Sequence, residues 1–291
     1  MFYEGKIFRP PSEAKSVILQ ISVGCKHNAC TFCTMYKDKS FRIKSRAEIK
    51  DILSVAQAQE PDAERVFLAD GDAIAINTDL LTEILDELYQ KFPHLKRVGI
   101  YGGPKDILAK SSEELAALKA HGLNIVYLGV ESGNESILRS VCKGVTTDQM
   151  IAAGQRVRAS GLTLSCTVIT GLGGKALSHE HAIDTAHVIS QIDPEYLGAL
   201  TLMLEEDAPL AKAIKDGSFQ VLSPFESLKE LRTMLGNLKV SNCIFRSNHA
   251  SNYLSLRATL PDDRDELLRT LDSTINNHTI ESLRPEYWRG F

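Results

Sequence analysis

The chain has 291 residues, a formal net charge of −4 and an isoelectric point near 6.1, with 43% hydrophobic and 24% charged residues. This balance is ordinary for a globular protein. The net charge argues against an extended basic face that binds nucleic acid. A nucleic-acid partner would therefore need a local basic patch. No apolar run approaches the ~20 residues that span a bilayer, and the first residues lack a signal-peptide pattern. We therefore expect a cytoplasmic protein without a membrane partner.

Apolar and amphipathic segments alternate along the first two thirds of the chain. The expected strands cover residues 17–23, 65–69, 97–101, 124–130, 163–169 and 196–204. The expected helices begin after Ser45, Ser111 and Thr146, each in a capping-box pattern, and also cover residues 80–88 and 180–192. Strands that alternate with helices predict right-handed βαβ units and a parallel sheet. Six such units fall short of a closed eight-fold barrel, so we expect an α/β fold with a partial (β/α)6 barrel.

The pattern changes after the sixth expected strand. A capping box at Ser223–Glu226 opens a long helix, followed by strand-like pieces at 243–248 and 253–258 and a helix at about 262–276. No internal repeat or Ser/Gly linker is present. We therefore expect a barrel core of residues 1–205 with an α+β extension of residues 206–291 packed on it. The aromatic residues Tyr287 and Trp288 are expected to pack back on the body.

Three of the six cysteines lie within nine residues, directly after the first expected strand, with the spacing Cys25-x4-Cys30-x2-Cys33. Three soft thiolates on one loop can hold a metal centre and leave one metal position open. A [4Fe–4S] cluster on three cysteines leaves one iron free for a ligand, whereas a structural zinc site normally closes with a fourth ligand. The alternatives are a zinc knuckle that uses His27, or a disulfide pair with a spare thiol. The remaining cysteines, which we expect to be buried small hydrophobes, are Cys142, Cys166 and Cys243.

Polar or glycine-rich turns follow the expected strands. In a parallel barrel such turns gather at one end and build the active site. Each turn alone is typical of ordinary chain reversal, and it is their joint placement with the cysteines that indicates a functional rim. The turns are Asp70-Gly71-Asp72, Gly102-Gly103-Pro104, Glu131-Ser132-Gly133 and Gly171–Gly174.

The cysteine loop, with Phe32 just before its last cysteine, resembles the radical S-adenosylmethionine (SAM) superfamily. The commonest spacing there is Cys-x3-Cys-x2-Cys, so this loop has one extra residue. The Glu131-Ser132-Gly133 element resembles the elongator, methylthiotransferase and coproporphyrinogen-oxidase branch. The resemblance covers residues 15–205. It implies a [4Fe–4S] cluster on Cys25, Cys30 and Cys33, SAM as the second cofactor, and an oxygen-sensitive enzyme.

The resemblance also implies roles toward SAM for residues on the turns. Asp70, Gly71 and Asp72 stand where the family has a Gly-Gly-Glu turn that receives the SAM amino group, although Asp replaces both the first Gly and the Glu. Glu131, with Ser132 beside it, matches the position that contacts the ribose.

Three further positions match the family, and two of them have ordinary structural alternatives. Gly171 matches a turn that lets the backbone approach the cofactor. Arg158 matches the position at which that branch often has an arginine that binds the SAM carboxylate. The alternative is that Arg158 is an exposed charge on a helix. Phe32 would pack near the adenine of SAM, and the alternative is that it packs in the hydrophobic core.

The implied mechanism is that a reduced cluster cleaves SAM to a 5′-deoxyadenosyl radical, which abstracts hydrogen from a small-molecule or peptide substrate. An electron donor such as flavodoxin or ferredoxin is the implied partner. One alternative is an enzyme that modifies tRNA or protein. A second is a non-catalytic iron–sulfur or zinc protein.

Substrate-side candidates are sparser. Tyr101, Lys105 and Asp106 follow the third expected strand on the same rim. The polar segment 246–252 is either an Asn- and Ser-rich hairpin loop or a cap over the barrel mouth, where its side chains could bind a polar substrate. We expect His179 and His181 to be structural residues on a helix surface. The candidate substrate residues of the polar segment are Asn248, His249 and Asn252.

Overall fold

The computed structural model describes residues 3–277 and 279–290, and its chain forms two compact units. The first unit comprises Met1–Asn28, Met35–Leu128 and Arg156–Leu164, and the second Ala29–Thr34, Gly129–Gln155 and Ser165–Phe291. Three elements run from one unit into the other: β6 (Leu123–Glu131), α6 (Thr147–Ala159) and β7 (Thr163–Thr170). Among the described residues, no helix combines the length and the apolar character needed to cross a membrane.

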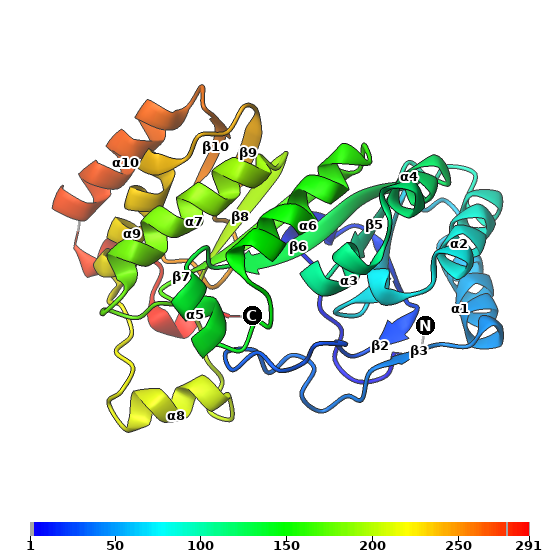
Figure 1. Ribbon diagram of the computed structural model, residues 1–291, viewed down its shortest axis with the longest axis horizontal. Helices are drawn as coiled ribbons and strands as arrows, with labels where there is room; N and C mark the ends of the chain where they lie inside the picture. Colours follow the sequence, from blue (N-terminus) through cyan, green and yellow to red (C-terminus); the bar gives the residue numbers. More distant parts are fainter. Residues whose placement is uncertain (1–2, 278, 291) are drawn as a thin grey trace. The chain divides into compact units, whose positions relative to one another are not determined.

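The first unit is a parallel sheet covered by helices. Its strands are ordered β1-β4-β5-β6 and pair in parallel. The helices α1 and α2 run side by side, and α4 also contacts α2 (Figure 1). A short antiparallel ribbon, β2 with β3, flanks the cysteine loop. The elements are η1 (Pro11–Glu13), β1 (Val17–Gln20), β2 (Ser22–Val23), β3 (Arg42–Ile43), α1 (Arg46–Gln59), β4 (Arg65–Ala69), η2 (Ala73–Ala75), α2 (Thr78–Lys91), β5 (Arg97–Tyr101), α3 (Pro104–Ala109) and α4 (Ser112–Ala120).

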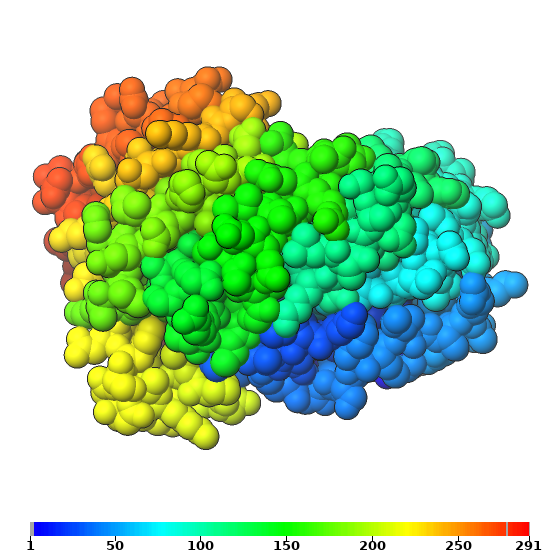
Figure 2. All heavy atoms as spheres, in the orientation of Figure 1, coloured from blue at the N-terminus to red at the C-terminus, as the bar shows by residue number. Residues whose placement is uncertain are grey.

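The second unit continues the strand order with β7-β8-β9-β10. The first three strands are parallel, and β10 pairs antiparallel with β9. The helix α9 lies between α7 and α10 and contacts both (Figure 1). The segment that contains α8, in yellow, projects from the surface of this unit (Figure 2). The elements are α5 (Glu135–Ser140), α7 (Ser178–Ile192), β8 (Tyr196–Thr201), α8 (Pro209–Lys215), α9 (Pro224–Asn237), β9 (Cys243–Arg246), β10 (Arg257–Leu260), α10 (Arg264–Asn277), η3 (Ile280–Ser282) and η4 (Glu286–Trp288).

The predicted α/β class is confirmed, with all six expected parallel strands present as β1, β4, β5, β6, β7 and β8. The capping boxes at Ser45, Ser111 and Ser223 form as expected, because each side chain accepts from the backbone N–H three residues on. The change of pattern after the sixth strand does not mark the end of the parallel sheet. The strand β9 adds in parallel to β8, so the sheet gains a seventh parallel strand from the extension. The predicted division at residue 205 stays a prediction.

Several short elements differ from the expectation. The first strand ends at Gln20, although Ile21 still donates its N–H to the Ala69 carbonyl, because Ser22 and Val23 pair with β3 instead. The final strand was expected at 253–258 and lies at Arg257–Leu260, and the strand expected at 196–204 ends at Thr201. The helices α3, α5 and α8 were missed, because six or seven residues are too few to show a helical period.

Two expectations about single side chains were wrong. Cys142 is exposed rather than buried, whereas Cys166 and Cys243 are buried as expected. Tyr287 and Trp288 do not pack back on the body: they are 80% and 69% exposed, and their rings contact each other edge to face. These two aromatic residues therefore form part of the surface.

We expect Gly133→Ala to lower the free energy of unfolding by about 3 kcal/mol, because overpacking against rigid neighbours costs this much. A Cβ at this position would lie 2.3 Å from the Asp184 carbonyl oxygen and 2.6 Å from Thr185 Cα, and both are backbone atoms of α7. The matched variant is Gly161→Ala, where φ is +77° but no atom lies within 4 Å. There we expect only the left-handed backbone strain of about 1 kcal/mol. Urea unfolding measures both, and equal costs would contradict this account.

Candidate active site

A buried carboxylate ties together the two sides of the cysteine loop within the first unit. Asp70 follows β4, is fully buried, and accepts three hydrogen bonds on Oδ2. The donors are Gln20 Nε2 at 3.0 Å, the Gly24 N–H at 3.0 Å and Lys39 Nζ at 2.9 Å. Gly24 precedes the first cysteine and Lys39 follows the last, so one side chain fixes the chain on both sides of the loop. Asp70 Oδ1 is buried and accepts no hydrogen bond from any part of the chain that the structure describes.

Further contacts bring the Asp70-Gly71-Asp72 turn against the start of the loop. A Cβ on Gly71 would lie 2.6 Å from the Tyr36 ring and 3.1 Å from Cys25 Cβ, so only glycine fits here. Asn28 Nδ2 donates to the Tyr36 carbonyl at 2.7 Å. The structure therefore places the predicted Gly71 beside Cys25, in one unit.

Asp72 forms a pair of buried carboxyls with Asp106, a residue of α3. Asp72 is 1% exposed and Asp106 is 7% exposed. Gly103 donates its N–H to Asp72 Oδ1 at 2.8 Å, and the ammonium of Lys26 binds Asp106. Burial, followed by the hydrogen bond and the charge of Asp106, raises the pKa of Asp72 to about 8. The Gly103 N–H and Lys26 oppose that rise only in part.

Lys26 was not among the predicted site residues, although it directly follows the first cysteine. Asp106 was predicted as a substrate-side candidate together with Lys105, which is exposed on α3. Tyr101 is half-buried at the end of β5, in edge-to-face contact with Phe67 at 4.9 Å between ring centroids. On this turn, the buried carboxyl of Asp106 is thus better placed for chemistry than the exposed Lys105.

The middle of the cysteine loop, residues 29–34, belongs to the second unit. Thr31 donates its N–H to the Val141 carbonyl at 3.0 Å and accepts on its own carbonyl from the Leu210 N–H at 2.9 Å. Phe32 packs against a buried cluster that includes Val141 and Leu172. The packing that we gave as the alternative for Phe32 is therefore present, and its predicted place near adenine stays a prediction.

Glu131 closes β6 in the left-handed region, with φ of +65°, and its carboxylate is held before any ligand binds. Its Oε1 accepts from Lys143 Nζ at 2.9 Å, with both side chains largely buried. The carboxylate lies directly over Gly129, where a Cβ would come within 2.1 Å of Glu131 Oε1. Ser132 is fully buried and accepts from the Asn134 N–H at 3.0 Å, which fixes the start of α5.

A second carboxylate that sequence reasoning missed supports the Gly171 turn. Glu230, on α9, is 5% exposed and accepts from the Gly171 N–H at 2.6 Å, from His181 Nδ1 at 2.9 Å and from Ser178 Oγ. Gly171 has φ of +87°, which favours glycine. His181 is buried rather than on the helix surface, whereas His179 is exposed. A glutamate 59 residues from its glycine partner gives no local sequence signal.

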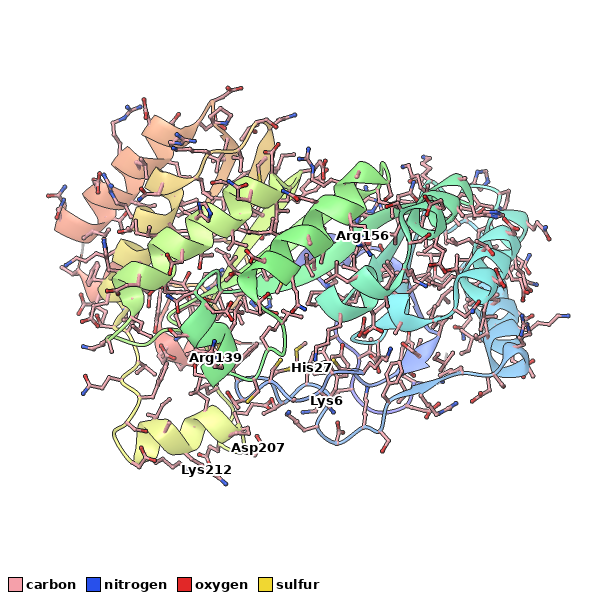
Figure 3. The ribbon with its side chains drawn as sticks, viewed as in Figure 1. Lys6, His27, Arg139, Arg156, Asp207 and Lys212 are labelled. Atoms are coloured by element: carbon pink, nitrogen blue, oxygen red, sulfur yellow. The ribbon has the colours of Figure 1, made fainter. Side chains whose placement is uncertain are left out.

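The remaining predicted positions of the first unit are Arg158 and His27. Arg158 lies half-exposed in the last turn of α6. Its neighbour Arg156, labelled in Figure 3, donates to the backbone carbonyls of Leu108 and Lys110 at 2.7 and 2.9 Å. His27, also labelled there, lies half-buried in the cysteine loop. The predicted role of Arg158 toward SAM stays a prediction.

The polar segment 246–252 begins with Arg246, the last residue of β9, and continues into the loop before β10. Asn252 is 4% exposed, donates to the Ala199 and Ser247 carbonyls, and accepts from Thr201 Oγ1 at 3.0 Å. His249 accepts on Nδ1 from the Ser251 N–H, and burial together with Arg284 lowers its pKa. Asn248 is exposed. The Asn252 side chain thus holds the loop on β8, and only Asn248 presents an exposed amide.

The donor set of the loop is three soft thiolates, which an iron–sulfur cluster accepts as ligands. Cys25 belongs to the first unit, and Cys30 and Cys33 belong to the second; all three are partly exposed. No group of three or more His, Cys, Asp or Glu side chains is gathered as a metal site within residues 3–277 and 279–290. Three soft thiolates match the preference of iron–sulfur clusters, and Gly71 leaves room beside Cys25 that a larger residue would fill.

Comparison with known families gives the class of protein. The model of the radical SAM superfamily matches residues 19–187, which include the cysteine loop and every turn described above. The chain belongs to this superfamily, whose members are enzymes that use a [4Fe–4S] cluster and SAM.

Curated relatives give the branch. The chain is 24% identical over 220 residues to the heme chaperone HemW of Bacillus subtilis, covering 71% of this chain and 55% of that protein. It is 28% identical over 171 residues to a tRNA-2-methylthio-N(6)-dimethylallyladenosine synthase of Dehalococcoides mccartyi, covering 56% of this chain and 39% of that protein. The chain therefore spans about half the length, or less, of these relatives.

A solved structure gives the fold. Coproporphyrinogen III oxidase (HemN) from Escherichia coli, a radical SAM enzyme, superposes with a TM-score of 0.56 at 19% sequence identity. The superposition covers 76% of this chain and 51% of that one. The partial-barrel fold and the branch expected from the sequence are thus confirmed.

The raised pKa of Asp72 predicts a loss of stability as the pH rises. Between the ordinary value of 3.8 and about 8, the unfolded chain releases this proton while the folded chain retains it. The free energy of unfolding of the wild type should therefore fall across this window, relative to Asp72→Asn, which stays neutral. Urea unfolding at pH 5, 7 and 9 measures the difference, with the exposed Asp51→Asn as control. Parallel curves for wild type and Asp72→Asn would contradict the prediction.

Proposed function

We propose that this radical SAM enzyme binds a [4Fe–4S] cluster through Cys25, Cys30 and Cys33 and cleaves SAM reductively at the cluster's open iron. When bound, the cluster and SAM supply an electron and a 5′-deoxyadenosyl radical that abstracts hydrogen from the substrate. The observation that carries the proposal is the buried Asp70 carboxylate, which ties Gly24 and Lys39 on either side of the cysteine loop to the turn beside Cys25. A loop held in this way keeps its thiolates in a fixed arrangement for the cluster.

The Asp70-Gly71-Asp72 turn is proposed to receive the SAM amino group. Asp70 Oδ1 is buried without a hydrogen-bond donor among the described residues, and Asp72 shares its site with Asp106. Hydrogen bonds from the SAM amino group to this pair, together with the positive charge of the SAM sulfonium, would favour the ionised form of Asp72 and displace the proton that it holds near neutral pH. Binding of SAM should therefore strengthen as the pH rises through about 8.

The other turns are proposed to hold the rest of SAM. Glu131, fixed over Gly129 by Lys143, has lone pairs left to accept the ribose hydroxyls. Gly171, whose N–H is held by Glu230, lets the backbone approach the cofactor. Arg158 is proposed for the SAM carboxylate, and Phe32 for contact near adenine.

The substrate is proposed to be a small molecule or a peptide side chain, with a flavodoxin- or ferredoxin-like protein as electron donor. The net charge of −4 supports this class over nucleic acid. Similarity to the tRNA-2-methylthio-N(6)-dimethylallyladenosine synthase keeps a tRNA substrate as the second candidate. Adding bulk tRNA to the cleavage assay separates them, because stimulation by tRNA would favour the second.

The experiment is the formation of 5′-deoxyadenosine. The chain is reconstituted with iron and sulfide under anaerobic conditions, given SAM and dithionite, and analysed by liquid chromatography with mass spectrometry. Cys30→Ala should abolish the product, because it removes a proposed cluster ligand. The matched control is Cys142→Ala, which removes an exposed cysteine outside the loop and should keep the wild-type amount. Equal product from Cys30→Ala and wild type would contradict the proposal.

Gly129→Ala should impair SAM binding without unfolding the chain. Its Cβ would collide at 2.1 Å with the end of the flexible Glu131 side chain, which can move aside. The displaced carboxylate would lose its position for the ribose, so we expect the Kd for SAM to rise roughly ten-fold, the effect of one lost hydrogen bond to a charged group. Isothermal titration of the reconstituted protein measures the Kd. An unchanged Kd would remove Glu131 from the proposed SAM site.

A further inference from the structure

The second unit contains a cavity of about 320 Å³ at the carboxyl ends of two parallel strands. Thr170 and Gly171 reach it from the end of β7, and Thr201 from the end of β8. Val221 and Leu222, from the connection between α8 and α9, form a second wall, and Glu286 and Arg289, from the C-terminal segment, form a third. The volume lies within the range of small-molecule sites.

Six of the thirteen residues that line the cavity have aliphatic or thioether side chains. They come from the end of β8, from α8 and from the segment that follows it, and they are only partly buried, except Val221, which is 46% exposed. A ligand in the cavity would cover this apolar surface and gain affinity from its removal from water. The apolar lining residues are Leu202, Met203, Leu204, Ile214, Val221 and Leu222.

Arg289, a cation in the lining of the cavity, already has a paired charge and hydrogen-bonded donors. The Arg289 side chain is 3% exposed and its Nη1 donates to both Glu286 carboxylate oxygens, at 2.6 and 2.8 Å. Its remaining nitrogens donate to the Ser251 carbonyl at 2.6 Å and to the Leu202 carbonyl at 3.0 Å. The guanidinium also lies over the Tyr253 ring at 4.2 Å. Arg289 therefore joins the C-terminal segment to β8 and the polar loop.

The hydroxyl hydrogens of two lining residues are engaged as well. Thr201 Oγ1 donates to Asn252 at 3.0 Å, and Ser227 Oγ donates to the Ser223 carbonyl at 3.0 Å. A charged group entering the cavity would lose its hydration and find no counter-charge that is not already paired.

We propose that this cavity binds an uncharged, mainly apolar group, and that Arg289 is a positioning residue that holds the C-terminal segment as its wall. One part of this rests on the proposed function, namely that the bound apolar group belongs to the substrate. The arginine in the cavity is thus not a binding site for a carboxylate or phosphate.

The chain carries its own reporter for the test. Trp288 is the only tryptophan and lies in the wall segment, between Glu286 and Arg289. The neutral probe N-phenyl-1-naphthylamine, bound in the cavity of the reconstituted protein, should quench Trp288 emission by energy transfer. Its sulfonated analogue, 8-anilino-1-naphthalenesulfonate, has the same arene frame with a negative charge. We expect the neutral probe to bind roughly ten-fold more tightly than the anion, because the charge must be desolvated without a free partner.

Matched variants locate the probe. Val221→Asp adds a charge to the lining, whereas Val55→Asp adds one at a similarly exposed valine, 41% exposed, on α1. Val221→Asp should weaken the neutral probe roughly ten-fold and Val55→Asp should not, because only the first places a charge against the bound probe. Equal affinities in the two variants would overturn the proposal.

Arg289→Met separates positioning from anion binding. Loss of the wall should weaken both probes together and lower the fluorescence anisotropy of Trp288. A selective loss of the anionic probe, or an anion that binds the wild type more tightly than the neutral probe, would overturn the proposal. None of these measurements depends on SAM cleavage, so failure here is distinct from failure of the proposed function.

Discussion

The arrangement of the first unit's functional residues depends on the buried ion pair between Asp70 and Lys39. The two side chains are 0% and 5% exposed, so neither charge is solvated by bulk water. A buried pair of this kind is stable only when hydrogen bonds complete it, and here Gln20 and the Gly24 N–H donate to the same oxygen. Removing either charge would leave the other buried and uncompensated. The pair therefore fixes where the cysteine loop leaves the sheet and where it returns.

The same physical device recurs on the other turns. Asp72 is held by Gly103 and Asp106, Glu131 by Lys143, and the Gly171 turn by Glu230 on α9. In each case a buried or largely buried carboxylate, at a strand end for Asp72 and Glu131 and on a helix for Glu230, is held by hydrogen bonds within the protein before any ligand arrives. Groups oriented in advance need little reorganisation when a ligand binds, which is how proteins stabilise charged ligands. Within each unit, the turns at the strand ends are thus prepared for a polar cofactor, and apolar side chains form part of the lining of the 320 Å³ cavity in the second unit.

Local patterns determine much of the fold, and these were readable in the sequence. The capping boxes and the apolar strands are properties of short segments, so the six parallel strands and the long helices could be predicted. The cysteine spacing and the Glu131 turn likewise carry their own signal. Elements of six or seven residues, such as α3 and α5, could not be predicted because they complete fewer than two turns.

Hydrogen-bonded partners that lie far apart in the chain could not be predicted from the sequence. Lys39 lies 31 residues from Asp70, and Glu230 lies 59 residues from Gly171, so no local pattern joins them. The exposure of Trp288 follows from Arg289, which uses its donors to hold the segment on β8 and leaves the aromatic rings outward. Asp106 could be named as a candidate from the sequence, but its pairing with Asp72 could not be predicted. Burial and pairing of these charges are properties of the folded chain.

The most direct measurement of the central claim is electron paramagnetic resonance of the reconstituted, dithionite-reduced protein, before and after addition of SAM. A cluster on Cys25, Cys30 and Cys33 should give the signal of a reduced [4Fe–4S] centre, and SAM at the open iron should change its g values. Asp70→Asn should lower the intensity of that signal, because the loop loses the charge that pairs with Lys39. A full signal that SAM leaves unchanged, or a protein that takes up zinc without sulfide, would contradict the account.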